Sequence, residues 1–276
     1  MSRTMQTELL GYHSVCLLSR ELTAQYRSLY NRINEYLVGG YAVVYTLESD
    51  PAKTLERMKQ GGISDVERFV ENGELNILSK ESVYTSLSER DQERSGKELV
   101  REFNSIVSNM KNKSGKPGNA KFKGISIMFS ADASFELGDF KKHMDFERLM
   151  GKHLDLEDVE LICFYKLQSL VKLGLSTLIL LLDYHHYTIH GGWKYRKWNP
   201  SDTIELIREG LDEVLDGENS ELLLRTLNLV YRTDNNSIIS QPEVFESNLR
   251  KALGDNKADM VVSSITEKIR KELSFG

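Results

Sequence analysis

The chain has 276 residues, of which 40% are hydrophobic and 28% are charged. This size and composition suit one large globular domain, or a medium domain followed by a small one. The formal net charge of −5 at pH 7 argues against direct nucleic-acid binding, because such proteins carry basic surfaces. The longest apolar run is too short to span a bilayer. The amino terminus lacks a basic segment followed by an apolar one, so we expect no membrane partner and a cytoplasmic location.

Short apolar segments alternate with segments of helical periodicity in the first 110 residues. The predicted strands are 15–18, 41–48 and 75–78, and the predicted helices are 22–37, 51–60, 66–72 and 99–110. In the first of these helices, apolar residues recur every three or four positions, which is the spacing of one helix face. The pair Gly39 and Gly40 then ends the helix.

The alternation continues as far as residue 182. The predicted strands are 125–129, 161–165 and 178–182, and the predicted helices are 140–153 and 168–173. A basic loop is expected over 111–121, which is rich in lysine and glycine. The strands are apolar on both faces and alternate with helices, which is typical of a parallel sheet covered on both sides. We therefore predict an α/β fold.

The pattern changes after Pro200, since every later segment has helical periodicity. Ser201 or Asp202 is a suitable N-cap for a helix over 202–215. Apolar residues also recur at helical spacing over 223–230, 245–253 and 261–273. We therefore predict an α/β domain over residues 1–198 and a small helical bundle over residues 199–276.

Several polar residues lie at or just beyond the carboxyl ends of predicted strands. They include Ser19, Glu48, Asp132 and Asp183. Ligands of a parallel sheet lie outside the carboxyl ends of its strands, so these positions favour a ligand pocket. The loop after the first strand, SRELTAQ, has neither the glycines nor the lysine of a phosphate-binding loop. ATP hydrolysis by that chemistry is not expected, and the sequence does not assign a catalytic residue.

The segment LILLLDYHHYTIHGGW at residues 178–193 concentrates three of the six histidines, His185, His186 and His190. These three with Cys163 form a candidate metal site, because imidazole and thiolate suit zinc and similar ions. His13, Asp183 and Cys16 are further candidate ligands. The spacing HHxxxH matches no strong zinc signature, so a hydrogen-bonded histidine surface remains the alternative. Cofactors are otherwise unknown, and a divalent metal is the open possibility. Cys16 and Cys163 are expected to be reduced.

The order of several motifs resembles the MEDS domain, the sensory domain of methanogens and methylotrophs found in the DcmR regulator. The motifs are GYHSVCLLS, GGYAVVYTLE, ISIMFSADASF, MDFERLM and ELICFY. The resemblance covers residues 11–192. The residues that match the family pattern are His13, Asp132 within ADASF, Glu147, Cys163 and Tyr165. The histidine-rich segment departs from the family pattern, which leaves the ligand open.

The resemblance implies a fold similar to the RecA/KaiC-type ATPases, without their phosphate loop, and a role in sensing small hydrocarbon derivatives or related metabolites. The C-terminal segment is similar to small helical domains of archaeal signalling proteins, which implies an output or dimerisation role. The chain is therefore predicted to be a sensor that binds a small ligand and relays to its helical tail. The predicted ligand-binding residues are His13, Ser19, Glu48, Asp132, Tyr165, Asp183, His185, His186 and His190.

Two other functions fit the same residues. One is a metalloprotein or enzyme that uses the histidine segment. The other is a RecA-like oligomeric scaffold without a small ligand, in which the chain assembles with copies of itself or with a signalling partner. Bound metal separates the first of these from a sensor, and a solution mass above that of the monomer would favour the scaffold.

Overall fold

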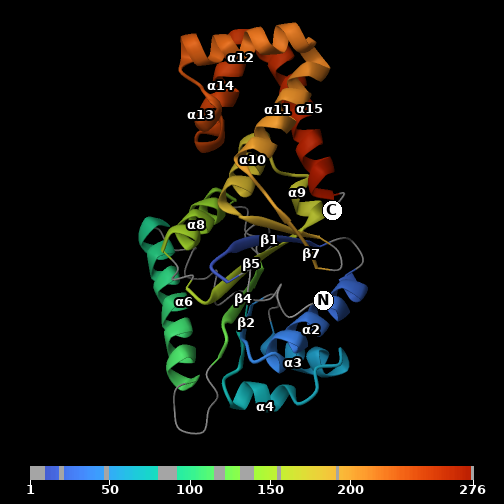
Figure 1. Cartoon of the computed structure of the whole chain (residues 1–276), viewed down its shortest axis with the longest axis vertical. Coiled ribbons are helices and arrows are strands. Elements are labelled where there is room, and N and C mark those ends of the chain that lie inside the picture. The colour runs from blue at the N-terminus through green and yellow to red at the C-terminus, as the bar shows by residue number, and fades with distance from the viewer. Residues whose placement is uncertain are drawn as a thin grey trace. The chain divides into compact units, whose positions relative to one another are not determined.

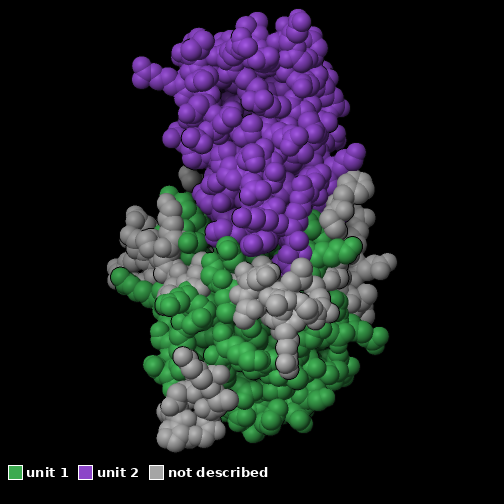
Figure 2. Space-filling view, viewed as in Figure 1, with its two compact units in different colours: residues 1–166, 189–194 green, residues 167–188, 195–276 purple. Residues whose placement is uncertain are grey.

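The computed structural model describes residues 10–18, 22–46, 50–79, 92–114, 122–130, 140–153, 157–190 and 193–274 (Figure 1). The chain divides into two compact units, which Figure 2 colours separately. Unit 1 comprises Met1–Lys166 and Ile189–Lys194, and unit 2 comprises Leu167–Thr188 and Tyr195–Gly276.

A seven-stranded sheet forms the centre of the α/β region. Its strands are β1 (His13–Leu18), β2 (Ala42–Thr46), β3 (Leu75–Ile77), β4 (Ile125–Ser130), β5 (Val159–Lys166), β6 (Tyr187–His190) and β7 (Lys194–Lys197). The strand order is β3-β2-β4-β5-β1-β6-β7, and β3, β2, β4, β5 and β1 pair in parallel. Parallel neighbours need crossover connections, which the helices provide. The predicted α/β class with a mainly parallel sheet is confirmed.

Helices cover both faces of the parallel strands in unit 1. They are α2 (Leu22–Val38), α3 (Pro51–Gln60), α4 (Val66–Glu71), α6 (Gln92–Ser114) and α8 (Phe140–His153). Figure 1 shows α6 and α8 on one side of the strands, and α2 and α3 on the other. Because both faces are covered, β1, β2, β4 and β5 are buried almost throughout.

The register between β1 and β5 determines which side chains share a face of the sheet. His13 lies opposite Leu161, and Val15 lies opposite Cys163. Successive side chains of a strand point to opposite faces. His13, Cys163 and Tyr165 therefore share one face, while Glu160 lies on the other. Strand β5 thus supplies buried polar side chains to both faces of the sheet.

The predicted strand over residues 178–182 is wrong, because this segment belongs to helix α10 (Leu175–Tyr184). Its buried residues include Leu175, Leu178, Ile179 and Leu182, which recur at helical spacing. A short run of apolar residues satisfies the pattern of a buried strand and of a buried helix equally well. The strands come later, as β6 and β7, which three residues join. A connection this short fits only antiparallel neighbours.

Unit 2 is helical apart from its parts of β6 and β7. Its helices are α9 (Leu167–Leu170), α10, α11 (Pro200–Leu215), α12 (Gly217–Tyr231), α13 (Asn235–Ser240), α14 (Pro242–Leu253) and α15 (Asp255–Ser274). The predicted C-terminal helices are confirmed, and α13 is an addition. Asn199 is the N-cap of α11, in place of the predicted Ser201 or Asp202. Asp202 instead accepts a hydrogen bond from the backbone N–H of Asn199 at 3.0 Å.

The compact units divide the chain differently from the predicted domains. Residues 167–188 lie in unit 2, whereas the sequence groups them with the α/β domain. Compactness does not show which segment folds independently, so the boundary between residues 198 and 199 stays a prediction. Among the helices of the described segments, none has both the length and the apolar character needed to cross a bilayer.

Candidate functional site

Four polar side chains lie together in the core of unit 1. His13 comes from β1, Cys163 and Tyr165 from β5, and Glu147 from α8. Their relative exposures are 0% for His13, Glu147 and Tyr165, and 1% for Cys163. Burying polar groups opposes folding unless they find partners. We call His13, Cys163 and Glu147 the buried centre.

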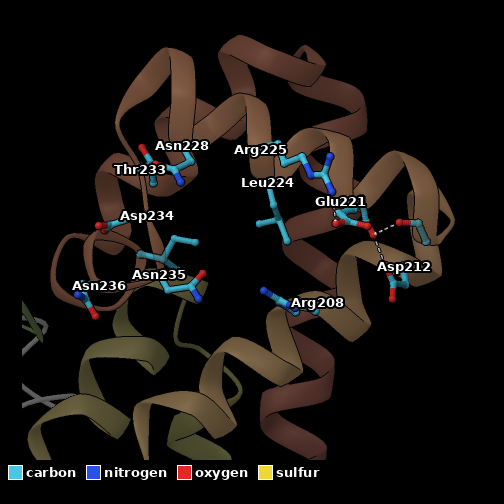
Figure 3. A pocket seen from close by; sticks show the side chains of 13 residues that line it. Arg208, Asp212, Glu221, Leu224, Arg225, Asn228, Thr233, Asp234, Asn235 and Asn236 are labelled. Atoms are coloured by element: carbon cyan, nitrogen blue, oxygen red, sulfur yellow. Dashed lines mark hydrogen bonds and ion pairs between the residues drawn. The ribbon is translucent and has the colours of Figure 1, made fainter.

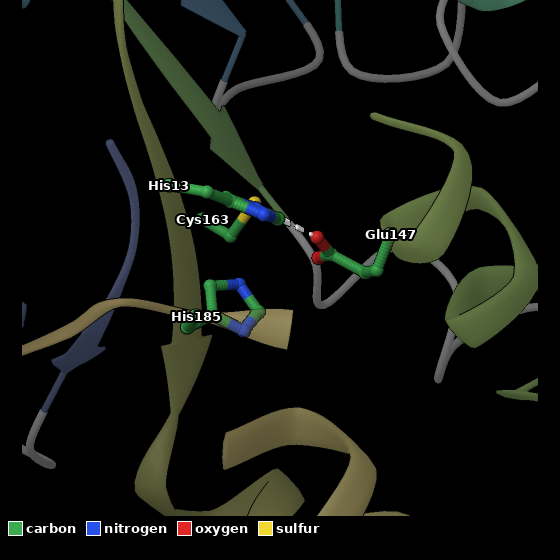
Figure 4. Close-up of side chains that lie close together, drawn as sticks. All are labelled: His13, Glu147, Cys163 and His185. Atoms are coloured by element: carbon green, nitrogen blue, oxygen red, sulfur yellow. Dashed lines mark hydrogen bonds and ion pairs between the residues drawn. The ribbon is translucent and has the colours of Figure 1, made fainter. Parts of the chain in front are cut away.

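The three side chains of the buried centre are in mutual contact. Nε2 of His13 lies 3.1 Å from Sγ of Cys163 and 3.0 Å from Oε2 of Glu147. The thiol of Cys163 donates to the same Oε2 at 3.2 Å. In Figure 4, the carboxylate of Glu147 reaches from α8 toward His13 and Cys163 on the sheet. One nitrogen, one sulfur and one oxygen therefore converge on a single point.

Gly151 of α8 lies next to the imidazole of His13. It lies one helical turn after Glu147, on the same side of α8. A Cβ atom at Gly151 would lie 3.6 Å from Nδ1 of His13, which is an ordinary van der Waals distance. Glu147 and Gly151 therefore both approach His13 from the same side of α8.

Tyr165 orients the carboxylate. Its hydroxyl donates a hydrogen bond to Oε1 of Glu147 at 2.7 Å. The other oxygen, Oε2, is the one that meets His13 and Cys163. In metal sites, a hydrogen bond from a residue that is not itself a ligand fixes the direction in which a ligating carboxylate points.

The surroundings of Cys163 differ from those of an activated cysteine nucleophile. Burial raises its pKa well above the ordinary value, and the charge of Glu147 and their hydrogen bond raise it further. A reactive cysteine requires the opposite, a thiolate stabilised in a partly exposed, electropositive environment. The buried centre therefore suits binding, in particular of a cation that would stabilise the thiolate, better than covalent catalysis.

A second polar cluster lies on the other face of the sheet, against α2. Glu160 of β5 accepts hydrogen bonds from the hydroxyls of Tyr36 and Ser126. Arg32 stacks on the ring of Tyr36, at 4.7 Å from its centroid, and donates to the Tyr36 hydroxyl at 3.4 Å. Burial raises the pKa of Glu160 to about 7, although Tyr36, Arg32 and Ser126 act in the other direction. This cluster was not predicted from the sequence.

The structure brings together three of the residues singled out from the sequence. His13, Tyr165 and Cys163 meet around Glu147. Ser19, Glu48 and Asp132 lie outside the described residues, so their predicted role at the strand ends stays a prediction. Glu147 matched the family pattern but was not predicted to bind ligand. Its place in the motif MDFERLM, which matches the family pattern, is the signal that could have found it.

The prediction that Asp183 follows a strand is wrong, because the preceding residues form helix α10. Asp183 is exposed and lies in the last turn of α10. His185 is buried at the end of that helix, with Nδ1 2.6 Å from the carbonyl oxygen of Leu181. His185 belongs to unit 2, and Figure 4 also labels it. Its role as a metal ligand stays a prediction.

The other two histidines of the predicted metal site have different environments. His186 is exposed, and His190 is buried at the end of β6. Over the residues that the structure describes, neither of them joins a group of three or more side chains able to hold a metal ion. The histidine segment by itself therefore does not form the predicted site. The chemistry gathers at the buried centre instead.

Two surface hollows compete as binding sites. A cavity of about 660 Å³ in unit 2 is lined by α11, α12 and the start of α13 (Figure 3). Its charges are partly satisfied locally, since Arg225 pairs with Glu221 at 2.7 Å. A hollow of about 720 Å³ in unit 1 lies at the β3 edge, between α3 and α6. Neither hollow is lined by a residue of the buried centre.

The fold and the buried centre define the class: an α/β domain that encloses a cluster of polar side chains in its core. The family model of the MEthanogen/methylotroph, DcmR Sensory domain (MEDS) matches residues 13–186. The chain belongs to the MEDS family. The match begins at His13 and includes every residue of the buried centre.

Other comparisons add little. The flagellar accessory protein FlaH from Methanocaldococcus jannaschii is similar in structure, with a TM-score of 0.45 and 14% sequence identity. The similarity covers 72% of this chain and 86% of that one. A search of curated protein sequences finds no match to this chain.

Proposed function

We propose that this chain is a cytoplasmic signal-transduction sensor. Its α/β region binds a small ligand at the buried centre, and its C-terminal helices carry the response. Membership of a sensory-domain family supports the general role. The observation that carries the proposal is the convergence of His13, Glu147, Cys163 and Tyr165 at almost complete burial, because a few polar groups enclosed by apolar walls can fix the orientation of a small ligand.

The surroundings of the centre favour a small ligand with an apolar body. Val15 of β1, Leu161 of β5 and Ile127 of the neighbouring strand β4 are fully buried, so apolar side chains line this part of the core. Ligand sites commonly combine apolar walls with a few polar groups that fix orientation. A small hydrocarbon derivative or a related metabolite, with one heteroatom to meet the polar groups, fits this combination.

The response depends on a difference in affinity. A ligand shifts a protein between two states only if it binds them unequally. α8 is the element most directly concerned, because it carries Glu147 while the other polar groups lie on the sheet. A ligand that enters between Glu147 and the strands would displace α8, and we propose that this displacement starts the relay.

Hydrogen-exchange mass spectrometry of the full chain tests the proposal. The probes are methanol, methylamine and dichloromethane, as simple one-carbon derivatives that differ in their heteroatom. The expected result is altered exchange in peptides of β1, β5 and α8, together with α11 or α15. Exchange that no probe alters in these segments, at concentrations up to the solubility limit, would contradict binding. Changes confined to unit 1 would contradict the relay.

A matched pair of variants locates the site. Cys163→Ser removes the thiol of the buried centre, whereas Cys16→Ser removes a thiol that is also buried but points to the opposite face of the sheet. The response to the effective probe should be lost in the first variant and kept in the second. Equal responses in both variants would place binding elsewhere.

A further inference from the structure

The three donor atoms of the buried centre come from three separate elements. His13 Nε2, Cys163 Sγ and Glu147 Oε2 lie 3.0–3.2 Å from one another, all out of contact with solvent. The segments that carry them are far apart in sequence, and only the fold unites them. We infer that His13, Cys163 and Glu147 form a binding site for a thiophilic divalent cation of the zinc type.

The donor set selects the kind of cation. Calcium and magnesium prefer sites made of oxygen atoms alone. A thiolate and an imidazole with one carboxylate are instead suited to zinc and other late first-row cations. Three protein ligands leave one tetrahedral position open, and a donor atom of a small molecule can take it. The inference rests on the proposed function in this respect, since both use the same centre.

The geometry needs only a small adjustment. Tetrahedral zinc, with bonds of about 2.3 Å to sulfur and about 2.0 Å to nitrogen, holds these two atoms roughly 3.5 Å apart. The present separation of His13 Nε2 and Cys163 Sγ is 3.1 Å. It would have to lengthen by about 0.4 Å, which small side-chain rotations can supply.

Charge balance also favours a divalent cation. A thiolate at Cys163 and a carboxylate at Glu147 carry two negative charges, and neutral His13 carries none. A cation of charge +2 makes the group neutral overall, which is the form that the protein interior tolerates. The thiol proton is released when the metal binds, because the thiolate is the ligand. Tyr165 holds Oε1 of Glu147 and so directs Oε2 toward the cation.

Titration with cobalt(II) tests the inference directly. The full-length protein is first stripped of metal with a chelator and then titrated, since cobalt replaces zinc and absorbs strongly when a thiolate binds it. We expect a thiolate-to-cobalt absorption that saturates at one equivalent in the wild type and in Cys16→Ser, and that is absent from Cys163→Ser. No such absorption in the wild type, or undiminished absorption in Cys163→Ser, would overturn the inference.

X-ray absorption of the zinc-loaded wild type keeps the test decisive if Cys163→Ser does not fold. One sulfur and at least two lighter atoms around zinc are expected. A zinc environment without sulfur would leave only a hydrogen-bonded cluster, and would refute the site. The proposed function is measured separately, by the exchange response of α11 and α15. Metal binding without that response contradicts the sensor alone, and the response in metal-free protein that binds no cobalt contradicts the metal site alone.

Discussion

The hydroxyl of Tyr165 donates to Oε1 of Glu147 at 2.7 Å and leaves Oε2 of the same carboxylate to His13 and Cys163. The two oxygens of one side chain thus have different partners, Tyr165 for one and His13 with Cys163 for the other. This relationship makes Tyr165 a positioning residue for the buried centre, two residues after Cys163 on the same face of β5.

Tyr165→Phe should therefore weaken metal binding without removing a ligand. Loss of such an outer partner lowers metal affinity by about 10- to 100-fold. The free energy of unfolding should also fall by roughly 1–3 kcal/mol, because a buried carboxylate oxygen loses its hydrogen bond. Competition between the protein and a chromogenic chelator measures the affinity.

A double-mutant cycle with Glu147→Gln is the control for this prediction. If Tyr165 acts through Glu147, the two changes together should alter affinity by less than the sum of their separate effects. Strictly additive effects would show that Tyr165 acts by another route.

Glu160 should make stability depend on pH. Its pKa is raised from 4.5 to about 7 in the folded protein, so the folded state binds the proton more tightly than the unfolded chain. The stabilisation is complete below pH 4.5 and is lost as the pH rises through about 7. The shift corresponds to roughly 3 kcal/mol.

Urea unfolding at several values between pH 5 and pH 8, in the presence of a chelator, measures this dependence. Glu160→Gln should abolish it, because the amide keeps the shape but does not titrate. The difference in unfolding free energy between the wild type and the variant should change by up to roughly 3 kcal/mol over the range. A difference that stays constant with pH would contradict the raised pKa.

Gly210 permits close contact between α11 and α15. A Cβ atom at this position would lie 2.8 Å from the backbone N and Cα of Ile265, and backbone atoms cannot move aside easily. Gly210→Ala should therefore destabilise the protein by about 1–3 kcal/mol, although alanine favours helices. Gly217→Ala is the matched control, since nothing lies within 4 Å of its added Cβ. Equal midpoints of thermal unfolding for both variants would refute the close contact.

The histidine segment gives a further pair of variants. His186→Gln should leave cobalt binding unchanged, because His186 is exposed and outside any described group of potential ligands. The sequence predicts His185 as a metal ligand. If that prediction is correct, His185→Gln should bind cobalt more weakly than the wild type. Cobalt affinity equal to that of the wild type in both variants would restrict the ligands to the buried centre.

The sequence predicts the α/β architecture well because each strand and helix has its own local pattern. Apolar runs of β-branched residues and the periodicity from Leu22 to Leu37 identify β2 and α2 without tertiary information. The failure at α10 has a physical reason. Nearly all of its residues are apolar, so the sequence does not distinguish the period of two of a strand from the period of 3.6 of a helix.

The site was predicted only in part, for a different reason. Cys163 and Tyr165 alternate along one strand, and the resemblance adds His13 and Glu147, but nothing in the local pattern shows that β1 lies beside β5. That pairing depends on the sheet order, which connects segments almost 150 residues apart. The three histidines of the histidine segment lie close together in the sequence, whereas the residues of the buried centre lie close together only in the folded structure.

The alternation of β5 has a consequence for folding fidelity. Glu160 faces Tyr36 and Ser126 on one side of the sheet, while Cys163 faces Glu147 on the other. A shift of β5 by one residue would move each of its side chains to the opposite face of the sheet. The carboxyl of Glu160 and the thiol of Cys163 would then be buried without their hydrogen-bond partners. Most buried parallel strands are uniformly apolar and gain little from one alignment over its neighbour. β5 carries a polar residue on each of its two faces, so a shifted register would bury both Glu160 and Cys163 among apolar side chains. The register that assembles the buried centre is therefore the one that the sequence of β5 favours most strongly.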